Sequence, residues 1–375
     1  MKILEICPFS AGICGVWARV REEAIRLANK GYEIRIFSSN FIKGSKERAV
    51  EKDKLGKIEI HRFPARKLGG ESFMEWDFKQ AAIDFKPDII IAHAYRHSHT
   101  LKALKIAERL RIKGRKCRVF LVTHAPFNRD STRSFLARIA VWYYDKFIAP
   151  KTINKFDKVI AITKWEIPYL LKLGLKKEKI ELIPNGAPEE FFTIKKLSKE
   201  ENKILFLGRV AEIKNLETVI LSIPLLKDKK IKFEIVGPSE KDYLWKLKKL
   251  IKKLKIENRV TFSPPIYDTK EKIKKIDSAM IFVLPSKSEG MPQSLIEAMA
   301  RRKIVISSNN SAGKEIIRDG KNGFLFRIGD EKELAKKINL ALNKKNEKLK
   351  NEARKSVVEF RWEKIIGKLN DLIKK

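Results

Sequence analysis

Two glutamates eight residues apart, Glu289 and Glu297, lie on either side of a predicted helix start. The apolar run 281–284 predicts a buried strand end, a polar loop with Gly290 follows, and Pro292 suits a first helical turn, where its missing N–H costs nothing. The unpaired N–H groups and the dipole at a helix start favour a phosphate. A phosphate flanked by carboxylates that can bind hydroxyls suits a sugar nucleotide. An ordinary strand–loop–helix unit with surface glutamates is the alternative.

Two cations, Arg209 and Lys214, follow a predicted strand at 204–207. At the carboxyl end of a strand, the arginine fork and the lysine point charge can converge on a diphosphate. The chain has 82 Lys and Arg residues, so this spacing is weak support by itself.

Histidines follow two other predicted strands. His124 comes directly after the strand 119–123, where it could polarise or hydrogen-bond a reacting group near neutral pH, or simply tie a loop. His93, His97 and His99 cluster after another strand, but no fourth ligand lies near them, so we expect no metal site there and place His93 at the lining of the cleft. The sequence has no Asp-x-Asp, so nothing indicates a divalent ion on a diphosphate.

These residues are positioned by a strand–helix alternation that runs along the chain twice. The fold class is therefore α/β, with two doubly wound halves, a cleft between them and a linker at about 186–200. The expected strands are Lys2–Cys7, Glu33–Ser38, Ile58–Phe63, Asp88–Ala92, Val119–Thr123, Lys158–Ile162 and Lys179–Ile183, then Ile204–Leu207, Lys232–Val236, Arg259–Phe262, Met280–Leu284, Ile304–Ser307 and Gly323–Phe326. The last helix is expected over Leu349–Lys374.

Composition narrows the class of protein. The 375 residues carry a net charge of +36, shared equally as +18 by residues 1–185 and +18 by residues 186–375. Such a field attracts polyanions, including an anionic membrane surface and nucleotide diphosphates; a Lys-rich solvated surface is the alternative. No zinc finger or RNA-binding aromatic motif appears, so no specific nucleic-acid partner is expected. Three cysteines without metal spacing, and no apolar run of membrane-spanning length, favour a cytoplasmic protein.

The segment 131–150 mixes aromatic bulk with cations, as interfacial helices do. Peripheral contact with the inner face of the cell membrane is one interpretation. Burial of this segment against the sheet of the first half is the one we favour from the sequence.

In this order, these residues resemble the family 4 retaining glycosyltransferases (glycosyl transferases group 1), which have the GT-B fold of two Rossmann-like domains facing across a cleft. The resemblance covers nearly the whole chain. It implies an N-terminal acceptor-side domain at 1–188, a nucleotide-sugar domain at 189–357, and a helix at 358–375 that returns to the first domain. The motifs that carry it are Glu289-x7-Glu297 within Ser-x-Glu-Gly-Met-Pro…Glu-Ala-Met-Ala, Gly208-Arg209…Lys214, Pro184-Asn185-Gly186, His124, Glu315…Asn322-Gly323, and the distance from Gly15 to Gly31.

The resemblance implies a retaining, metal-independent transfer of a sugar from a nucleotide diphosphate to a glycan or a lipid-linked acceptor, without a cofactor. Arg209 and Lys214 would hold the diphosphate, Glu289 would contact the transferred sugar, and His124 would lie near its reacting carbon. Another GT-B enzyme, such as a sugar-nucleotide epimerase, and a non-catalytic basic polyanion-binding protein are the alternatives.

The resemblance also implies a set of donor-binding residues. Glu297 would bind the ribose hydroxyls, the loop of Gly12 and Gly15 would close over the phosphates, and the base would lie around Gly237. The backbone at the helix start would assist Arg209 and Lys214 in holding the diphosphate, through Gly290, Met291, Pro292 and Gln293.

Two positions depart from the family pattern. Cys14 replaces the first glycine of a usual Gly-Gly pair, which makes close approach of that backbone to a phosphate less certain. Arg302 stands where the family commonly ends the helix with glycine, and arginine has a steric cost in a left-handed cap.

Overall fold

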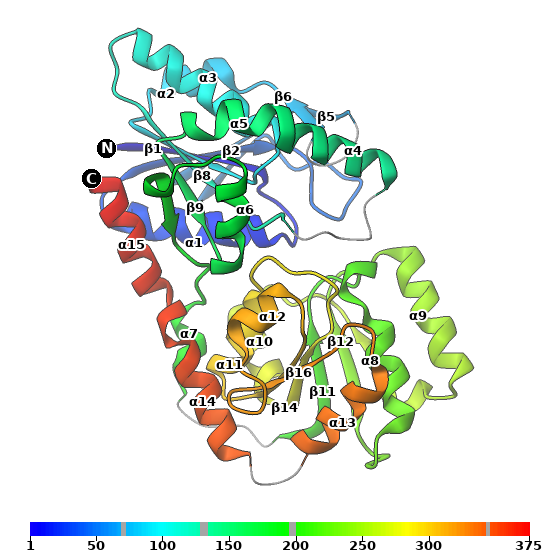
Figure 1. Ribbon diagram of the computed structural model, residues 1–375. Coiled ribbons are helices and arrows are strands. Elements are labelled where there is room, and N and C mark those ends of the chain that lie inside the picture. Colours follow the sequence, from blue (N-terminus) through cyan, green and yellow to red (C-terminus); the bar gives the residue numbers. More distant parts are fainter. Residues whose placement is uncertain (69–72, 128–133, 195–199, 343–345) are drawn as a thin grey trace. The chain divides into compact units, whose positions relative to one another are not determined.

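The computed structural model describes residues 1–68, 73–127, 134–194, 200–342 and 346–375. The chain divides into two compact units (Figure 1). The first unit contains the chain up to Asn185 together with Lys364–Lys375, and the second contains Gly186–Glu363. The corresponding boundaries expected from the sequence are after residues 188 and 357.

The first unit is built on a sheet of order β10-β9-β8-β7-β1-β2-β4-β3, in which β3 alone is antiparallel to its neighbour. A separate hairpin pairs β5 with β6. The strands are β1 (Lys2–Phe9), β2 (Glu33–Ser39), β3 (Lys52–Leu55), β4 (Ile58–Phe63), β5 (Ala65–Lys67), β6 (Met74–Trp76), β7 (Ile89–His93), β8 (Arg118–Val122), β9 (Lys158–Ala161) and β10 (Ile180–Leu182).

Helices complete this unit because a parallel sheet must be covered on both faces. In α1 the buried residues Val20, Ala24 and Leu27 recur at the helical period and turn one side to the core. The helices of the unit are α1 (Gly15–Asn29), α2 (Lys79–Phe85), α3 (Ser98–Ile112), α4 (Phe135–Tyr143), α5 (Ala149–Thr152), α6 (Ile167–Lys172) and most of α15 (Trp362–Lys374).

The second unit has an all-parallel sheet of order β13-β12-β11-β14-β15-β16. Its strands are β11 (Glu201–Leu207), β12 (Lys232–Val236), β13 (Val260–Ser263), β14 (Ala279–Leu284), β15 (Ile304–Ser308) and β16 (Phe324–Phe326). Its helices are α7 (Glu189–Phe192), α8 (Leu216–Ser222), α9 (Lys241–Lys253), α10 (Thr269–Asp277), α11 (Gln293–Ala300), α12 (Ser311–Ile316), α13 (Glu331–Ala341) and α14 (Glu347–Val357).

Both sheets have the doubly wound order that the sequence predicted. In each, the strand order reverses beside the first strand, between β1 and β7 in the first unit and between β11 and β14 in the second. Ligands of open α/β sheets bind at this reversal, outside the carboxyl ends of the strands. The fold therefore points to the loops after β1, β7, β11 and β14.

Two details differ from the expectation, and a third concerns the departure from the family pattern at Arg302. The predicted continuous helix 349–374 is interrupted, because a turn at Val358–Phe360 and an extended Arg361 separate α14 from α15. Pro292 is the N-cap residue of α11 and not its first helical residue. Arg302 does adopt the left-handed conformation, with φ 58°, and its guanidinium pairs with Glu347 at 2.6 Å.

The predicted burial of the aromatic segment 131–150 is also wrong for α4. None of its residues is buried, and Phe135 and Leu136 are about three-quarters exposed. Burial begins only at Tyr144 and Ala149, in the π-helical turn and helix that follow. The first part of the predicted segment, residues 131–133, lies outside the described residues. Over the parts of the chain that are described, no helix is both long and apolar enough to cross a membrane.

Candidate active site

The loops after β11 and β14 are joined by hydrogen bonds in the second unit. The amide of Lys287 donates to the carbonyl of Ile213 at 2.9 Å, and the side-chain amide of Asn215 donates to the carbonyl of Pro285 at 3.3 Å. Asn215 adopts a left-handed conformation with φ 53°, which asparagine tolerates better than most residues. The two loops singled out in the sequence therefore form one rigid edge at the strand reversal.

Lys214 and Glu289 meet at this edge. The Nζ atom of Lys214 lies 2.5 Å from Oε1 of Glu289, and the hydroxyl of Ser286 donates to the same oxygen at 2.6 Å. The two charged side chains are only 18% and 13% exposed. A lysine held by a carboxylate at the mouth of a parallel sheet can exchange that partner for a phosphate, while the carboxylate turns to sugar hydroxyls.

Glu297 lies apart from this pair. Its carboxylate is buried on α11 and forms an ion pair of 2.5 Å with the ammonium group of Lys272 on α10. Sequence reasoning did not find Lys272, because nothing in its surroundings sets it apart from the many lysines of α10. Each glutamate of the motif thus has its own lysine.

Arg209 is held by a different partner. Its guanidinium donates to Glu240 at 2.7 Å, and the side chain is 36% exposed. The structure places Lys214 in contact with Glu289. The contact with Glu240 uses Nη1 of Arg209, and a guanidinium has five N–H donors in all.

Gly208 and Gly237 bring the ends of β11 and β12 together. Their φ values are 158° and 147°, and a Cβ atom on Gly237 would lie 2.0 Å from the carbonyl oxygen of Gly208. Val210 and Glu240 continue the contact: the Val210 amide donates to Pro238 at 2.8 Å and the Glu240 amide to Val210 at 2.9 Å. The close approach of the two backbones thus explains why position 237 is glycine. That Gly237 lies beside the nucleotide base stays a prediction.

The residues predicted to assist donor binding through their backbone lie at the helix start after β14. Gly290 precedes Met291, which is largely buried, and Pro292 caps α11 without a side-chain hydrogen bond. The side-chain amide of Gln293 reaches the carbonyl of Gly186 at 3.5 Å. Their predicted contacts with a donor remain predictions.

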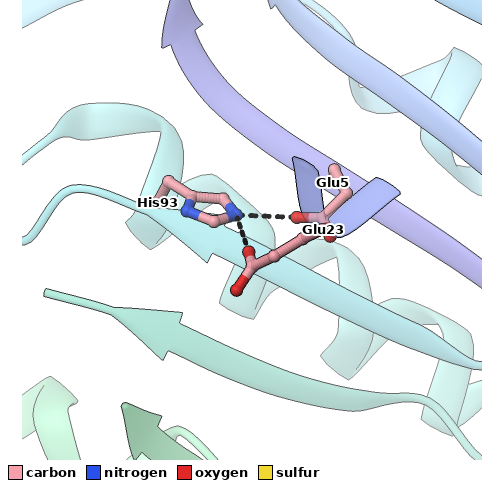
Figure 2. A group of neighbouring side chains, drawn as sticks. All are labelled: Glu5, Glu23 and His93. Atoms are coloured by element: carbon pink, nitrogen blue, oxygen red, sulfur yellow. Dashed lines mark hydrogen bonds and ion pairs between the residues drawn. The ribbon is translucent and has the colours of Figure 1, made fainter. Parts of the chain in front are cut away.

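A buried polar cluster occupies the strand reversal of the first unit. Glu5 of β1 and His93 at the end of β7 lie on the same face of the sheet, since Glu5 pairs with Ile91 two residues earlier. The Nε2 atom of His93 lies 2.6 Å from Oε2 of Glu5 and 3.9 Å from Oε2 of Glu23, which belongs to α1; Figure 2 shows both carboxyl groups directed at this ring nitrogen. The Nδ1 atom of His93 lies 3.0 Å from Nε2 of His124.

A cation, Arg19, enters this cluster from α1. Its Nη2 atom lies 2.7 Å from Oε1 of Glu23, one helical turn along. It also donates to the carbonyl of Ile183 at 2.9 Å and to the side-chain oxygen of Asn185 at 3.0 Å. All of these groups are buried.

Burial controls the protonation of the cluster. Desolvation raises the pKa of Glu5 to about 8, although Arg19 opposes the shift. Desolvation likewise raises the pKa of Glu23 and lowers the pKa of His93 to about 4. The pKa of His124 falls well below its usual range through burial and the neighbouring His93.

Glu5, Glu23 and His93 are also the one group, among the described residues, whose ligand atoms have the spacing of metal ligands, within 4.8 Å of one another. Arg19 already supplies a positive charge there, so we interpret the group as a proton network. Among the three clustered histidines, His99 directs its Nε2 atom to the carbonyl of His93 at 2.7 Å.

The glycine loop after β1 is only partly as expected. Gly12 has φ 82°, and a Cβ atom there would lie 2.5 Å from the carbonyl oxygen of Lys43, so this position requires glycine. Gly15 is the first residue of α1 and has open space around it. Cys14 is the N-cap of α1, with extended backbone and no capping side-chain bond.

Several residues of the cluster were missed by sequence reasoning. The available signal was a charged residue in an otherwise apolar strand, as at Glu5, and a buried Arg–Glu pair at helical spacing. The missed residues of the first unit are Glu5, Arg19, Glu23, Thr123 and Glu166; Glu166 accepts hydrogen bonds from Thr123 and from the amides of Ile162 and Thr163.

Two family models match the chain. Residues 13–191 match the model described as Glycosyltransferase Family 4, and residues 188–356 match Glycosyl transferases group 1. An uncharacterized glycosyltransferase of Methanocaldococcus jannaschii is 27% identical over 365 residues, which cover 90% of this chain and 88% of that protein.

Two further proteins help to place the chain. A Campylobacter jejuni α-1,4-N-acetyl-D-galactosaminyltransferase acting on a diphospho-undecaprenol-linked sugar chain is 30% identical over 213 residues, 52% of this chain and 56% of that protein. Anabaena HepE, solved in complex with UDP and glucose, superposes with a TM-score of 0.77 at 16% identity, covering 100% of this chain and 99% of that one.

The two doubly wound units and the loops at their strand reversals thus define a glycosyltransferase with the GT-B fold. More narrowly, the chain belongs to glycosyltransferase family 4. It is an enzyme, and neither the epimerase nor the non-catalytic binding protein considered from the sequence is favoured.

Proposed function

We propose that this enzyme transfers a sugar from a nucleotide diphosphate to a glycan or lipid-linked acceptor, with retention of configuration and without a metal ion. The observation that carries the proposal is the ion pair between Lys214 and Glu289 at the strand reversal of the second unit. A donor diphosphate takes Lys214, and the released Glu289 carboxylate accepts hydrogen bonds from the hydroxyls of the sugar.

The chemistry follows from where charge develops. As the glycosidic bond breaks, the leaving diphosphate gains negative charge, and fixed cations stabilise that charge more in the transition state than in the ground state. Lys214 and Arg209 are those cations, and the N-terminus of α11 adds its N–H groups. The attack from the same face assisted by the leaving phosphate needs no protein nucleophile.

A nucleotide donor is supported by the fold relative from Anabaena, whose structure holds UDP and glucose. A thermal-shift series tests it: wild type with UDP, GDP, ADP and their sugars, each with EDTA present. One nucleotide should raise the melting temperature, because a ligand at a hundred times its Kd adds about 2.7 kcal/mol. No shift with any nucleotide, or a shift that needs a divalent ion, would contradict the proposal.

A lipid-linked acceptor is supported by the relative from Campylobacter jejuni, whose name states an undecaprenol-linked substrate, and by the surface of α4. We define the α4 face as Phe135, Leu136, Ile139, Trp142 and Tyr143, all exposed, with Phe147 beyond them. Lys146 lies over the Trp142 ring at 4.9 Å, so cationic charge accompanies the apolar groups. Apolar and cationic groups on one helix suit an anionic membrane surface.

Vesicle co-sedimentation tests the α4 face. The double variant Phe135→Ser/Trp142→Ser should lose most binding to vesicles with anionic lipid. Trp245→Ser is the matched control, since Trp245 is 63% exposed beside Lys249 on α9. Equal loss in the control, or full binding by the double variant, would remove α4 from the acceptor side.

A further inference from the structure

We infer that Glu5, His93 and His124 form a hydrogen-bonded proton relay in which His93 is a positioning residue that sets which ring nitrogen of His124 carries the proton. The chain of contacts is continuous, from Oε2 of Glu5 to Nε2 of His93 at 2.6 Å and from Nδ1 of His93 to Nε2 of His124 at 3.0 Å. Each ring nitrogen of His93 is thus used, and only Nδ1 of His124 remains for another partner.

The charge balance decides how this chain is protonated. Within the described residues of the cluster, the two buried carboxyl groups Glu5 and Glu23 have one cation, Arg19. Its Nε donates to Oε1 of Glu23, and its Nη2 lies 2.7 Å from the same oxygen as an ion pair. A second buried anion would have no counter-charge, and burying an unpaired charge is costly. Glu5 is therefore the carboxyl group that keeps its proton.

The hydrogen bonding of Glu5 agrees with this. Its Oε1 atom is buried and has no donor within the described part of the chain. A buried carboxylate needs several donors, whereas the carbonyl oxygen of a neutral acid is less costly to leave bare. The pKa of Glu5, raised by burial to about 8, points the same way.

With Glu5 protonated, the tautomers of His93 and His124 are both determined. The Glu5 hydroxyl donates to Nε2 of His93, so His93 carries its proton on Nδ1 and donates it to Nε2 of His124. His124 then carries its own proton on Nδ1 and presents an N–H donor.

Loss of one proton reverses every bond in the relay. The proton on Nδ1 of His124 leaves to solvent, the His93 proton moves to Nε2 of His124, and the Glu5 proton moves to Nε2 of His93. Glu5 becomes a carboxylate, both imidazoles stay neutral, and Nδ1 of His124 becomes an acceptor. One deprotonation therefore changes what His124 offers a ligand.

The backbone around the relay is held in an unusual form. His124 has φ 58° and Ala94, directly after His93, has φ 79°. Left-handed conformations at non-glycine residues cost about 1–3 kcal/mol and cluster at functional sites. The amide of Ala94 donates to the carbonyl of Val122 at 2.9 Å, which fixes the two strand ends that carry the histidines.

Other ionisable groups face the relay from the surrounding elements. Cys7 lies on the strand of Glu5, and His97 precedes α3 and acts on His124. Glu166, whose pKa burial raises while its hydrogen bonds and Arg19 oppose that rise, bonds Thr123, one residue before His124. These groups influence the midpoint of the switch, and Glu166 provides a control.

Histidine tautomers can be read directly by two-bond ¹H–¹⁵N NMR on the full chain with labelled histidine. The five histidines are assigned by single His→Gln variants. At pH 7 we expect His93 and His124 to be neutral, with the proton on Nδ1 in both. Between pH 7 and 9.5 both should convert together to the Nε2–H form, with one shared midpoint.

Glu5→Gln is the decisive variant. Its amide still donates to Nε2 of His93 but has no proton to lose, so both rings should stay in the Nδ1–H form through pH 9.5. Glu166→Gln, a buried carboxyl group outside the relay, should leave the switch in place. If Glu5→Gln does not fold, the wild-type titration alone still tests the relay.

The relay is overturned if either histidine carries its proton on Nε2 at pH 7, if the two convert at separate midpoints, or if Glu5→Gln still switches. One equivalent of zinc bound by wild type and lost in Glu23→Gln would also overturn it. The role of His124 in sugar transfer rests on the proposed function: kcat/KM should fall above pH 8 in wild type and not in Glu5→Gln. The NMR result needs no donor, so it separates failure of the relay from failure of the proposed function.

Discussion

Lys214 and Glu289 neutralise each other in a site with little solvent exposure. In the proposed exchange, each gains a new partner when a donor arrives. At the residue scale, this proposal predicts that donor binding and turnover depend most on Lys214 among the cations of the site.

Lys214→Ala should lower turnover by ~10²-fold or more, as loss of a preorganised donor of hydrogen bonds to a developing charge typically does. Lys246→Ala is the control, because Lys246 is a 63% exposed lysine, 3.8 Å from Glu212 of the same loop. Initial rates with the donor found in the thermal-shift series measure both. Wild-type turnover in Lys214→Ala would remove Lys214 from the site.

Gly237→Ala should destabilise the second unit by about 3 kcal/mol or more, since the new Cβ atom would meet the carbonyl oxygen of Gly208 at 2.0 Å. Gly320→Ala separates strain from collision, because Gly320 has φ 72° but open space, and about 1 kcal/mol is expected. Urea unfolding of both variants gives the comparison. Equal losses would mean that the close approach is not what requires Gly237.

The sequence predicted that residues of loop motifs, such as Glu289 and Lys214, lie near each other, because the ends of neighbouring strands converge in a parallel sheet. It did not identify the partners of Glu5 and Arg19 in other elements. The register of β1 against β7 brings Glu5 to His93, and the packing of α1 brings Arg19 to Ile183 and Asn185. Contacts of this kind are set by tertiary packing, so a charged residue in an apolar strand or an Arg–Glu pair at helical spacing does not name the partner.

At the element scale, β12 is tied to its neighbours by a charge network. Glu234 accepts from Lys275 at 2.8 Å and from Ser263 at 2.6 Å, and it pairs with Lys203 of β11 at 3.1 Å. Burial acts to raise the pKa of Glu234, but these hydrogen bonds and charges outweigh it and lower the pKa to about 2.

Because its folded pKa lies below the unfolded value of 4.5, Glu234 contributes stability that is complete above pH 4.5 and is lost as the pH falls toward 2. Glu234→Gln should therefore lower the free energy of unfolding by about 2 kcal/mol at pH 6, and the difference from wild type should shrink by pH 3. The control Glu201→Gln removes a 64% exposed partner of Lys203 and should cost under about 0.5 kcal/mol. A difference that stays constant with pH would contradict the ionic role of Glu234.

Most strands could be predicted because buried parallel strands are short apolar runs between turn residues. The break between α14 and α15 could not, because apolar residues continue at helical spacing through it. Gly186 explains the break: a Cβ there would lie 2.5 Å from the Trp362 ring, and Ala187 bonds with both Phe360 and Trp362. The exposure of α4 could not be predicted either, since its composition fits a buried helix as well as an exposed one.

At the scale of the whole molecule, the first unit is discontinuous in sequence. Ile365, Leu369 and Ile373 of α15 are fully buried, and Asn370 accepts a hydrogen bond from Tyr32 at 2.9 Å. The core of the first unit therefore depends on residues that come after the entire second unit.

Leu369→Ala should destabilise the first unit by about 2–5 kcal/mol, the usual cost of a cavity in a packed core. Hydrogen exchange should show the loss of protection in β8 and β9 and not in β11 or β14. Lys368→Ala, at an exposed neighbouring position, should change neither. Equal loss in both units would mean that they unfold as one.

The late position of α15 also orders events during synthesis. Residues up to Asn185 leave the ribosome before α15, whose buried side completes their core, has been made. All of Gly186–Glu363 is synthesised before that helix appears. At about 5–20 residues per second this interval is on the order of ten to forty seconds. The second unit is contiguous and needs nothing that follows it, so it can finish folding while the first still has an uncovered apolar surface. The half that is translated first is thus the half that is completed last.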